Sequence, residues 1–268
     1  MIYALYFSPN GTTLRVLNNI IAGMAIEPIR IDLSVLANRK KDYHFQADDL
    51  VLYGTITAGM LFAGNKEVFA HLHGNGAAFV GVAMYGNGYY GVSLKQLNQR
   101  AASSGFRVIA LAAFIGQHAQ GSAIAAGRPD EKDAELQRQF GREILVKKDA
   151  LCQAIPVGWS SSSLYNVIVF ARQFMQSQDY VLPGFLKTKE ATDSCISCGK
   201  CVRGCPVEAI TMGPQKKPTF DTKKCIACYR CINNCPRHAI QCTSGLMNGI
   251  AKDFGNRFEE RKEPTVVI

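Results

Sequence analysis

The most constraining feature of this sequence is a repeated run of cysteines near its C-terminal end. The 16 residues from Cys195 to Ile210 recur 30 positions later, from Cys225 to Ile240, and eight of the 16 positions are identical. Each copy has the spacing C-x2-C-x2-C-x3-C-P. A repeat of this kind predicts a duplicated domain with pseudo-twofold symmetry.

The clustering of the cysteines indicates metal ligands rather than disulfides. Nine of the ten cysteines follow Gln153 and eight lie in the two copies, whereas a disulfide framework distributes its bridges through a small secreted domain. Zinc is the alternative, but structural zinc sites pair CxxC units about 12–20 residues apart. Here three cysteines fall within seven positions, twice. The spacing therefore favours two 4Fe–4S clusters.

Residues 190–243, including the connection from Lys217 to Asp221, resemble bacterial-type two-cluster ferredoxins. In that family the fourth cysteine of each run binds the other cluster. The resemblance implies that one cluster is held by Cys195, Cys198, Cys201 and Cys235, and the other by Cys225, Cys228, Cys231 and Cys205. Pro206 and Pro236 are expected to begin short helices, where a missing N–H is tolerated.

The first 152 residues alternate apolar runs of strand length with helical patterns. We expect strands at residues 2–7, 28–33, 50–56, 78–85 and 106–114, and helices at residues 12–24, 65–73, 92–103 and 130–152. Apolar strands separated by helices indicate a parallel sheet that is covered on both faces. Right-handed crossovers make such a sheet doubly wound.

The predicted domain organisation has four parts. Residues 1–152 form the α/β domain, and residues 153–192 a helical connector and linker, with a helix from about Ser160 to Gln178. Residues 193–243 form the cysteine domain, and residues 244–268 a C-terminal tail that shows no clear period after Ala251.

The loop between the first strand and the first helix is a candidate phosphate site. Backbone N–H groups and the helix dipole favour an anion at this place in an α/β fold. Ser8, Asn10, Thr12 and Thr13 add neutral donors, and Gly11 lets the backbone approach closely. No lysine follows the loop, so the pattern is not that of a nucleoside triphosphate site. The donors suit the phosphate of flavin mononucleotide (FMN).

This loop, S-P-N-G-T-T, resembles the flavodoxin signature S/T-x-T-G-N-T, from which it departs at two positions. Flavodoxin-like proteins place two further loops beside the flavin ring. The resemblance implies that these ring contacts come from Thr55, Ile56, Thr57, Ala58 and Gly59 after the third strand, and from Tyr85, Gly86, Asn87, Tyr89 and Tyr90 after the fourth. Tyrosine has the flat amphipathic face that stacking on a flavin requires. Gly88 stands where the family usually has a basic residue.

From Ile2 to about Thr243 the chain resembles the flavodoxin-like/ferredoxin fusion proteins of anaerobic bacteria, including the stretches Met84–Asn87 and Ala113–His118. The resemblance implies an α/β, flavodoxin-like, doubly wound parallel five-stranded sheet followed by a small α+β two-cluster ferredoxin domain. It also implies that His118 approaches the flavin, although a lone histidine is more typically a structural hydrogen-bonding residue.

The implied function is electron transfer that couples two 4Fe–4S clusters to FMN and converts between one-electron and two-electron carriers. Two alternatives stay open. One is an iron–sulfur flavoprotein oxidoreductase that reduces a small molecule, for which the sequence identifies no catalytic residue. The other is a ferredoxin on a flavin-free adaptor domain.

The charge of the chain is the main evidence on its partners. The net charge of +9 would suit nucleic acid, but each oxidised cluster with four thiolates carries about −2 and a flavin phosphate adds further negative charge. We therefore expect no nucleic-acid partner, and expect the remaining basic face to steer an acidic redox protein. A homodimer is left open.

Hydropathy indicates a cytoplasmic protein without a membrane partner. No apolar run approaches the roughly 18 residues of a membrane span, and no basic segment precedes the first apolar run.

The pair His71 and His73 is interpreted as surface residues rather than as a metal site, because residues i and i+2 of a helix point to different sides.

Overall fold

The computed structural model describes residues 1–62, 64–120, 123–146, 155–156 and 182–268. The expected helix from Ser160 to Gln178 lies outside the described residues. So do most of the expected connector before residue 182 and the end of the helix expected at residues 130–152. No helix in the described ranges has the length and apolar character needed to cross a membrane.

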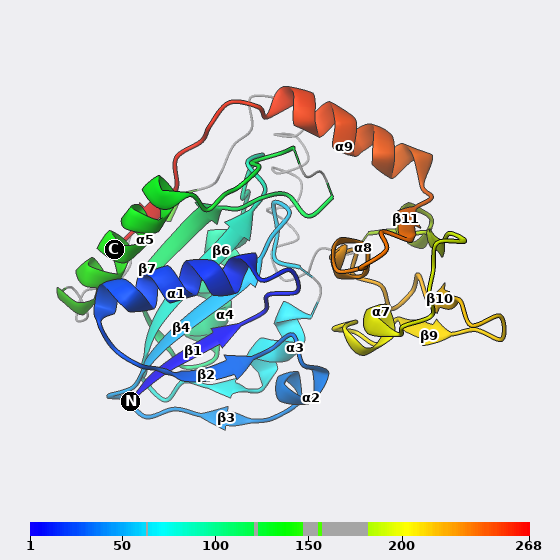
Figure 1. Ribbon diagram of the computed structural model, residues 1–268. Coiled ribbons are helices and arrows are strands. Elements are labelled where there is room, and N and C mark those ends of the chain that lie inside the picture. Colours follow the sequence, from blue (N-terminus) through cyan, green and yellow to red (C-terminus); the bar gives the residue numbers. More distant parts are fainter. Residues whose placement is uncertain (63, 121–122, 147–154, 157–181) are drawn as a thin grey trace.

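One six-stranded sheet organises the first domain (Figure 1). Its strands are β1 (Ile2–Tyr6), β2 (Ile29–Asp32), β4 (Leu50–Ile56), β6 (Ala78–Tyr85), β7 (Arg107–Ile115) and β12 (Thr265–Val267). The order is β12-β7-β6-β4-β1-β2, and all pairs are parallel except β12 with β7. The five parallel strands have the order 2-1-3-4-5 of flavodoxin-like folds, which confirms the predicted fold class.

Helices cover both faces of this sheet, and each face has its own core. On one face lie α1 (Thr12–Met24) and α5 (Glu131–Val146), and on the other α3 (Asn65–Ala70) and α4 (Ser93–Ser103). The buried residues of α1 recur every three or four positions, from Val16 to Met24, and each such side chain stabilises the fold by about 1.5–3 kcal/mol. A Cβ on Gly141 would lie 2.1 Å from the carbonyl oxygen of Ile20, so this glycine lets α5 approach α1 closely.

The helix expected at residues 65–73 ends at Ala70, and a short strand follows. After α2 (Leu36–Arg39), β3 (Tyr43–His44) pairs in parallel with β5 (Leu72–His73). Residues i and i+2 of an extended chain share a side, and His71 and His73 both contact Oδ1 of Asp42, at 3.1 and 3.2 Å. The expectation that these histidines point to different sides is therefore wrong.

The cysteine domain has the predicted duplicated form. It contains η1 (Gly184–Leu186), β8 (Lys189–Ala191), α7 (Lys200–Arg203), β9 (Ile210–Met212), β10 (Pro218–Phe220), α8 (Arg230–Asn233) and β11 (Ile240–Cys242). Strand β9 pairs with β10, and β8 pairs with β11. Strand β8 therefore lies in the stretch expected to be linker and is structured by a partner about 50 residues away.

The expectation that Pro206 and Pro236 begin helices is wrong, because α7 and α8 lie before the fourth cysteine of each copy. After each proline the chain turns back instead. Ala209 N–H donates to Cys205 Sγ at 3.2 Å, and Ala239 makes the equivalent bond in the second copy. Glu208 and His238, with φ of +51° and +48°, are left-handed, so no right-handed helix continues from either proline.

The last 24 residues contain a helix and a strand, although the sequence shows no clear period after Ala251. Helix α9 (Gly245–Arg257) leaves the cysteine domain, and β12 then joins the edge of the main sheet (Figure 1). In the register of this pairing Thr265 faces Ala113 and Val267 faces Leu111. Three residues carry too little pattern to predict a strand, whereas the exposed edge of β7 supplies the hydrogen-bonding partner.

Candidate functional site

A cavity of about 510 Å³ lies at the carboxyl ends of β1, β4 and β6. This is the switch point where α/β sheets bind ligands, and the volume is within the range of small-molecule sites. The structure brings ten of the expected flavin contacts to this cavity: Ser8, Asn10, Thr12, Thr13, Ile56, Thr57, Ala58, Tyr85, Gly86 and Tyr89.

The donors of the first loop fit a phosphate. Gly11 caps α1 with a φ of +83°, a conformation that favours glycine, and no acidic side chain lies in the first turn of α1. Ser8 Oγ accepts a hydrogen bond from Leu14 N–H at 3.0 Å, which leaves its own proton to donate. Thr13 Oγ1 is buried and has no hydrogen-bond partner within the described residues. Thr13 lines the cavity, but its Oγ1 is enclosed by protein atoms, as is that of Thr55 outside the cavity, so the phosphate donors of this loop are Ser8, Asn10 and Thr12.

Five expected contacts do not line the cavity. All of them except Thr55 have structural roles, and that of Gly11 is to cap α1. Gly59 packs against the Tyr89 ring, where a Cβ would lie 2.5 Å from Cε2. Asn87 donates to the carbonyl oxygens of Phe258 and Glu260, at 2.6 and 2.8 Å. The residues outside the lining are Gly11, Thr55, Gly59, Asn87 and Tyr90. Tyr90 packs edge-on against Tyr85, with ring centroids 5.7 Å apart.

Helix α9 contributes an apolar wall that the sequence did not predict. Met247, Ala251 and Phe254 line the cavity. A Cβ on Gly88 would lie 2.0 Å from Cζ of Phe254, so the basic residue that is usual in the family would collide with this ring. The only sequence signal for this wall was the glycine at that position.

His118 faces the cavity as a neutral side chain. Burial lowers the pKa of His118 to about 4, and its Nδ1 accepts a hydrogen bond from Gln120 N–H at 3.2 Å. The proton of the neutral ring therefore lies on Nε2. The Phe254 ring lies beside it, with centroids 5.3 Å apart. His118 thus has both the structural hydrogen bond and the place at the cavity that the sequence left as alternatives.

Two smaller voids lie within the cysteine domain. One is lined by Cys195, Cys198, Cys201 and Cys235. The other is lined by Cys205, Cys225, Cys228 and Cys231. In each void the fourth cysteine comes from the other copy of the repeat, as in the two sets implied by the ferredoxin resemblance.

The buried thiols of the second void stay protonated until a metal ion binds. Burial raises the pKa of Cys228 to about 11 and that of Cys231 to about 12. Such thiols become thiolates when metal binding compensates their charge. Lys189 Nζ lies 3.4 Å from Cys225 Sγ and 5.3 Å from the centroid of the Tyr229 ring, and so adds positive charge beside this void.

The second cysteine loop is part of the cavity wall. Ala227, Cys228 and Tyr229 line the cavity as well as the second void. Asn10 Nδ2 donates to the carbonyl oxygen of Cys228 at 2.7 Å. A residue of the expected phosphate loop therefore holds a residue of the expected cluster loop.

Arg39 adds a second contact between the domains that sequence reasoning missed. Its guanidinium is buried and donates to the carbonyl oxygens of Leu33, at 2.7 Å, and of Pro206. It lies over the Phe7 ring, 5.4 Å from the centroid. Burial lowers the pKa of Arg39. A charged residue in a four-residue helix gives no sequence signal for such a role.

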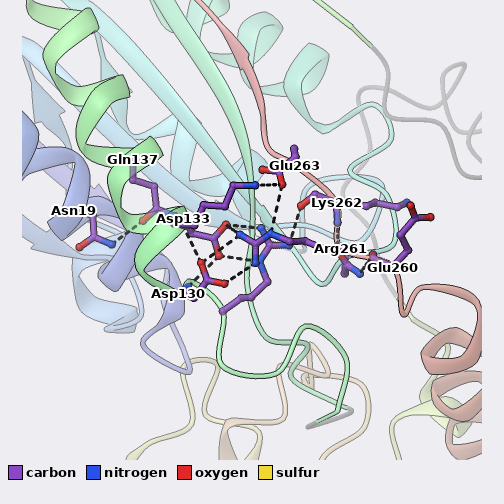
Figure 2. Close-up of polar contacts among 11 residues, drawn as sticks. Asn19, Asp130, Asp133, Gln137, Glu260, Arg261, Lys262 and Glu263 are labelled. Atoms are coloured by element: carbon purple, nitrogen blue, oxygen red, sulfur yellow. Dashed lines mark hydrogen bonds and ion pairs between the residues drawn. The ribbon is translucent and has the colours of Figure 1, made fainter.

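A polar network fastens the C-terminal segment to the start of α5 (Figure 2). Arg261 binds Asp130 at 2.5 Å and Asp133 at 3.0 Å. The hydrogen bond from Arg261 lowers the pKa of Asp130. Arg128 Nε binds the buried Asp133 at 2.8 Å, and its Nη1 donates to the carbonyl oxygen of Lys262 at 2.9 Å. These bonds set the path of the chain between α9 and β12.

One segment of the chain matches a known family model. Residues 194–239 match the family model of the 4Fe-4S dicluster domain. No curated protein sequence matches the chain.

Among solved structures, the chain is similar to a flavodoxin from the domain Archaea, with 16% identity and a TM-score of 0.39 over 55% of this chain and 98% of that chain. It is similar to two-electron reduced Megasphaera elsdenii flavodoxin, with 19% identity and a TM-score of 0.36 over 53% and 99% of the two chains. It is also similar to the apo form of the NADH:FMN oxidoreductase EMOB, with 17% identity and a TM-score of 0.37 over 54% and 88%.

Proposed function

We propose that this chain, which joins a flavodoxin-like domain to a ferredoxin-type 4Fe–4S dicluster domain, transfers electrons between two 4Fe–4S clusters and an FMN bound in the cavity. The observation that carries the proposal is the position of Cys228. This residue lines the cavity and one of the four-cysteine voids at the same time. Electrons therefore need no separate carrier between the two sites.

The clusters would pass single electrons and the flavin would hold one or two, so together they would convert between one-electron and two-electron carriers. The chain's own residues bind and orient the flavin. The loop from Ser8 to Thr13 would hold the phosphate, and Tyr89 offers a flat face for stacking. His118 presents an Nε2–H donor, and α9 excludes water.

The order of the two cysteine sites follows from the interface. The set Cys205, Cys225, Cys228 and Cys231 lies next to the cavity. The set Cys195, Cys198, Cys201 and Cys235 has no member in the cavity wall. We assign the first set to an inner cluster and the second to an outer cluster, through which electrons enter or leave.

A flavin-free adaptor domain fits the structure less well. Such a domain would have no use for the cavity at the sheet's switch point. Because thiolate ligands persist in a reducing compartment, we place the protein in the cytoplasm.

Anaerobic purification tests the proposal. We expect about eight iron atoms and one FMN per chain, with flavin fluorescence that appears on denaturation. Titration with dithionite should then reduce the clusters and the flavin of the same molecule. Protein with iron but without flavin, even after incubation with FMN, would contradict the proposal. Fast turnover with a small-molecule acceptor would assign the chain to the reductases instead.

A further inference from the structure

The two cysteine copies have the same backbone conformation, and each residue of the first copy has an equivalent 30 positions later. Ser197 and Ala227 have the same φ of +56°, and Gly199 and Tyr229 are both left-handed, with φ of +69° and +59°. Helices α7 and α8 begin at equivalent residues. Any difference between the copies therefore lies in their side chains and surroundings.

The second copy is docked on the flavodoxin-like domain. Ile226 packs against the core of that domain, and Ala227 and Tyr229 are buried. Asn233 Nδ2 donates to the carbonyl oxygen of Ala119 at 3.0 Å. Together with the bond from Asn10 to Cys228, these contacts bring the inner cysteine set to the cavity.

The equivalent face of the first copy lies open. Ile196, the equivalent of Ile226, is 59% exposed. Ser197 and Cys198 are exposed. Pro236, which lines the outer void beside them, is also exposed, whereas its equivalent Pro206 at the inner void is buried. The carbonyl oxygen of Cys198 accepts a hydrogen bond from the chain's own Arg203, at 3.0 Å. The domain thus carries a second copy of its docking face, beside the outer cysteine set.

This open face carries more positive charge than the docked face. Arg203 stands at the position of Asn233, and Arg237 at that of Val207, whereas Lys200 has a basic equivalent in Arg230. Lys200, Arg203, Lys216 and Arg237 are exposed and form no ion pair within the described residues, whereas Lys217 is paired with Asp193 at 2.7 Å. A bound cluster of about −2 would leave a net positive charge here.

The cations surround exposed apolar side chains. Ile196 and the 40% exposed Met212 line the outer void together with Lys200 and Arg237. Lys216 is near, because its carbonyl oxygen accepts a hydrogen bond from Ser197 Oγ at 2.5 Å. We call this surface the distal face; it consists of Ile196, Ser197, Lys200, Arg203, Met212, Lys216 and Arg237. An apolar centre with a charged rim is typical of transient protein interfaces.

We propose that the distal face docks an acidic one-electron carrier protein, and this proposal rests on the proposed function. In each encounter the carrier is oxidised by one electron and this chain is reduced by one, or the reverse, with no bond made or broken. Two encounters supply the electron pair of a two-electron carrier. A second copy of this chain would be a poor occupant, because it presents the same cations and a formal charge of +9.

Stopped-flow oxidation of a reduced, acidic bacterial flavodoxin by the oxidised holoprotein tests this proposal. We expect the double variant Lys200→Glu/Arg203→Glu to lower the second-order rate constant about 10-fold or more at low ionic strength, and the difference to shrink as salt screens the charges. Arg203→Asn, which installs the residue of the docked copy, should lower it about 2-fold to 5-fold. Lys252→Glu, an exposed change on α9, is the matched control and should leave the rate unchanged.

Iron content and the cluster absorbance verify that each variant is folded, and Arg203→Asn keeps the test available if the double variant is not. Rates that are equal in all variants and independent of salt would overturn the docking proposal. So would a fall with Lys252→Glu as large as with the double variant, or dimerisation through the distal face. Dithionite separates the two proposals: if it reduces the clusters while bound flavin stays oxidised, the proposed function fails. If it reduces both while the carrier rate ignores the variants, only the docking proposal fails.

Discussion

The cavity has two kinds of wall. The loops after β1, β4 and β6 belong to the flavodoxin-like domain and supply the hydroxyls and amides of the expected phosphate site. The opposite wall comes from outside that domain, from the second cysteine loop and from α9, and is mainly apolar. Under the proposed function the two walls would divide the work: the first would bind the flavin, and the second would connect it to the inner cluster and close it off from water.

The largest effect is expected at the second cysteine loop, in the wall between the cavity and the inner cysteine set. Cys228→Ser should remove the inner cluster, so that about half of the iron is lost, and should stop dithionite-reduced clusters from reducing the flavin rapidly. Iron analysis and stopped-flow absorbance measure both. Cys242→Ser is the matched control, because Cys242 lines neither void. Full iron content in Cys228→Ser would contradict the assigned ligand set.

The attachment of the C-terminal segment, whose helix α9 closes the cavity, should depend on the buried ion pair between Arg128 and Asp133. Arg128→Met would leave Asp133 buried with weakened compensation, and loss of one partner of such a pair costs about 3–5 kcal/mol. Thermal or chemical denaturation measures this loss. Arg138→Met is the control, because Arg138 binds Glu131 and Glu135 at the surface, where a pair contributes less than about 1 kcal/mol. Equal losses in the two variants would contradict the role of this network.

The free energy of unfolding of the flavin-free protein should decrease as the pH is lowered, because of His118. The folded pKa of about 4 lies below the ordinary value of 6.5, so the unfolded chain takes up a proton first as the pH falls. Stability is therefore lost between about pH 6.5 and pH 4, by roughly 3 kcal/mol. Denaturation at several pH values measures it, and His118→Asn should remove most of this slope. An unchanged slope in that variant would assign the effect to other groups.

The smallest effect is expected at the binding wall. Thr12→Val removes a hydroxyl at the cavity without changing the shape of the side chain and should weaken FMN binding about 10-fold, the value of one hydrogen bond to a charged group. Fluorescence quenching of FMN measures the Kd. Thr55→Val is a close control, because Thr55 is a buried threonine that does not line the cavity. Similar Kd values for the wild type and Thr12→Val would place the phosphate elsewhere.

Elements with a strong local pattern could be predicted closely. The bounds of α1, β4 and β6 agree with the expectation, because each carries a continuous apolar run or a regular 3.6-residue period. Strands β2 and β7 differ by one residue at each end. The short strands β8 and β12 escaped prediction, because each is stabilised by a partner that lies far away in the sequence.

The amino-acid sequence by itself predicted the chemistry of the two expected sites, the cysteine sets and the phosphate loop. The spacing of the cysteines and the donors from Ser8 to Thr13 are local patterns, and local patterns survive without knowledge of the fold. Only the tertiary structure decided which cysteine set adjoins the cavity, which copy of the repeat is left open, and that α9 covers one side of the cavity. Those choices depend on contacts between residues such as Asn10 and Cys228, 218 positions apart, and no periodicity in a chain encodes a contact of that range.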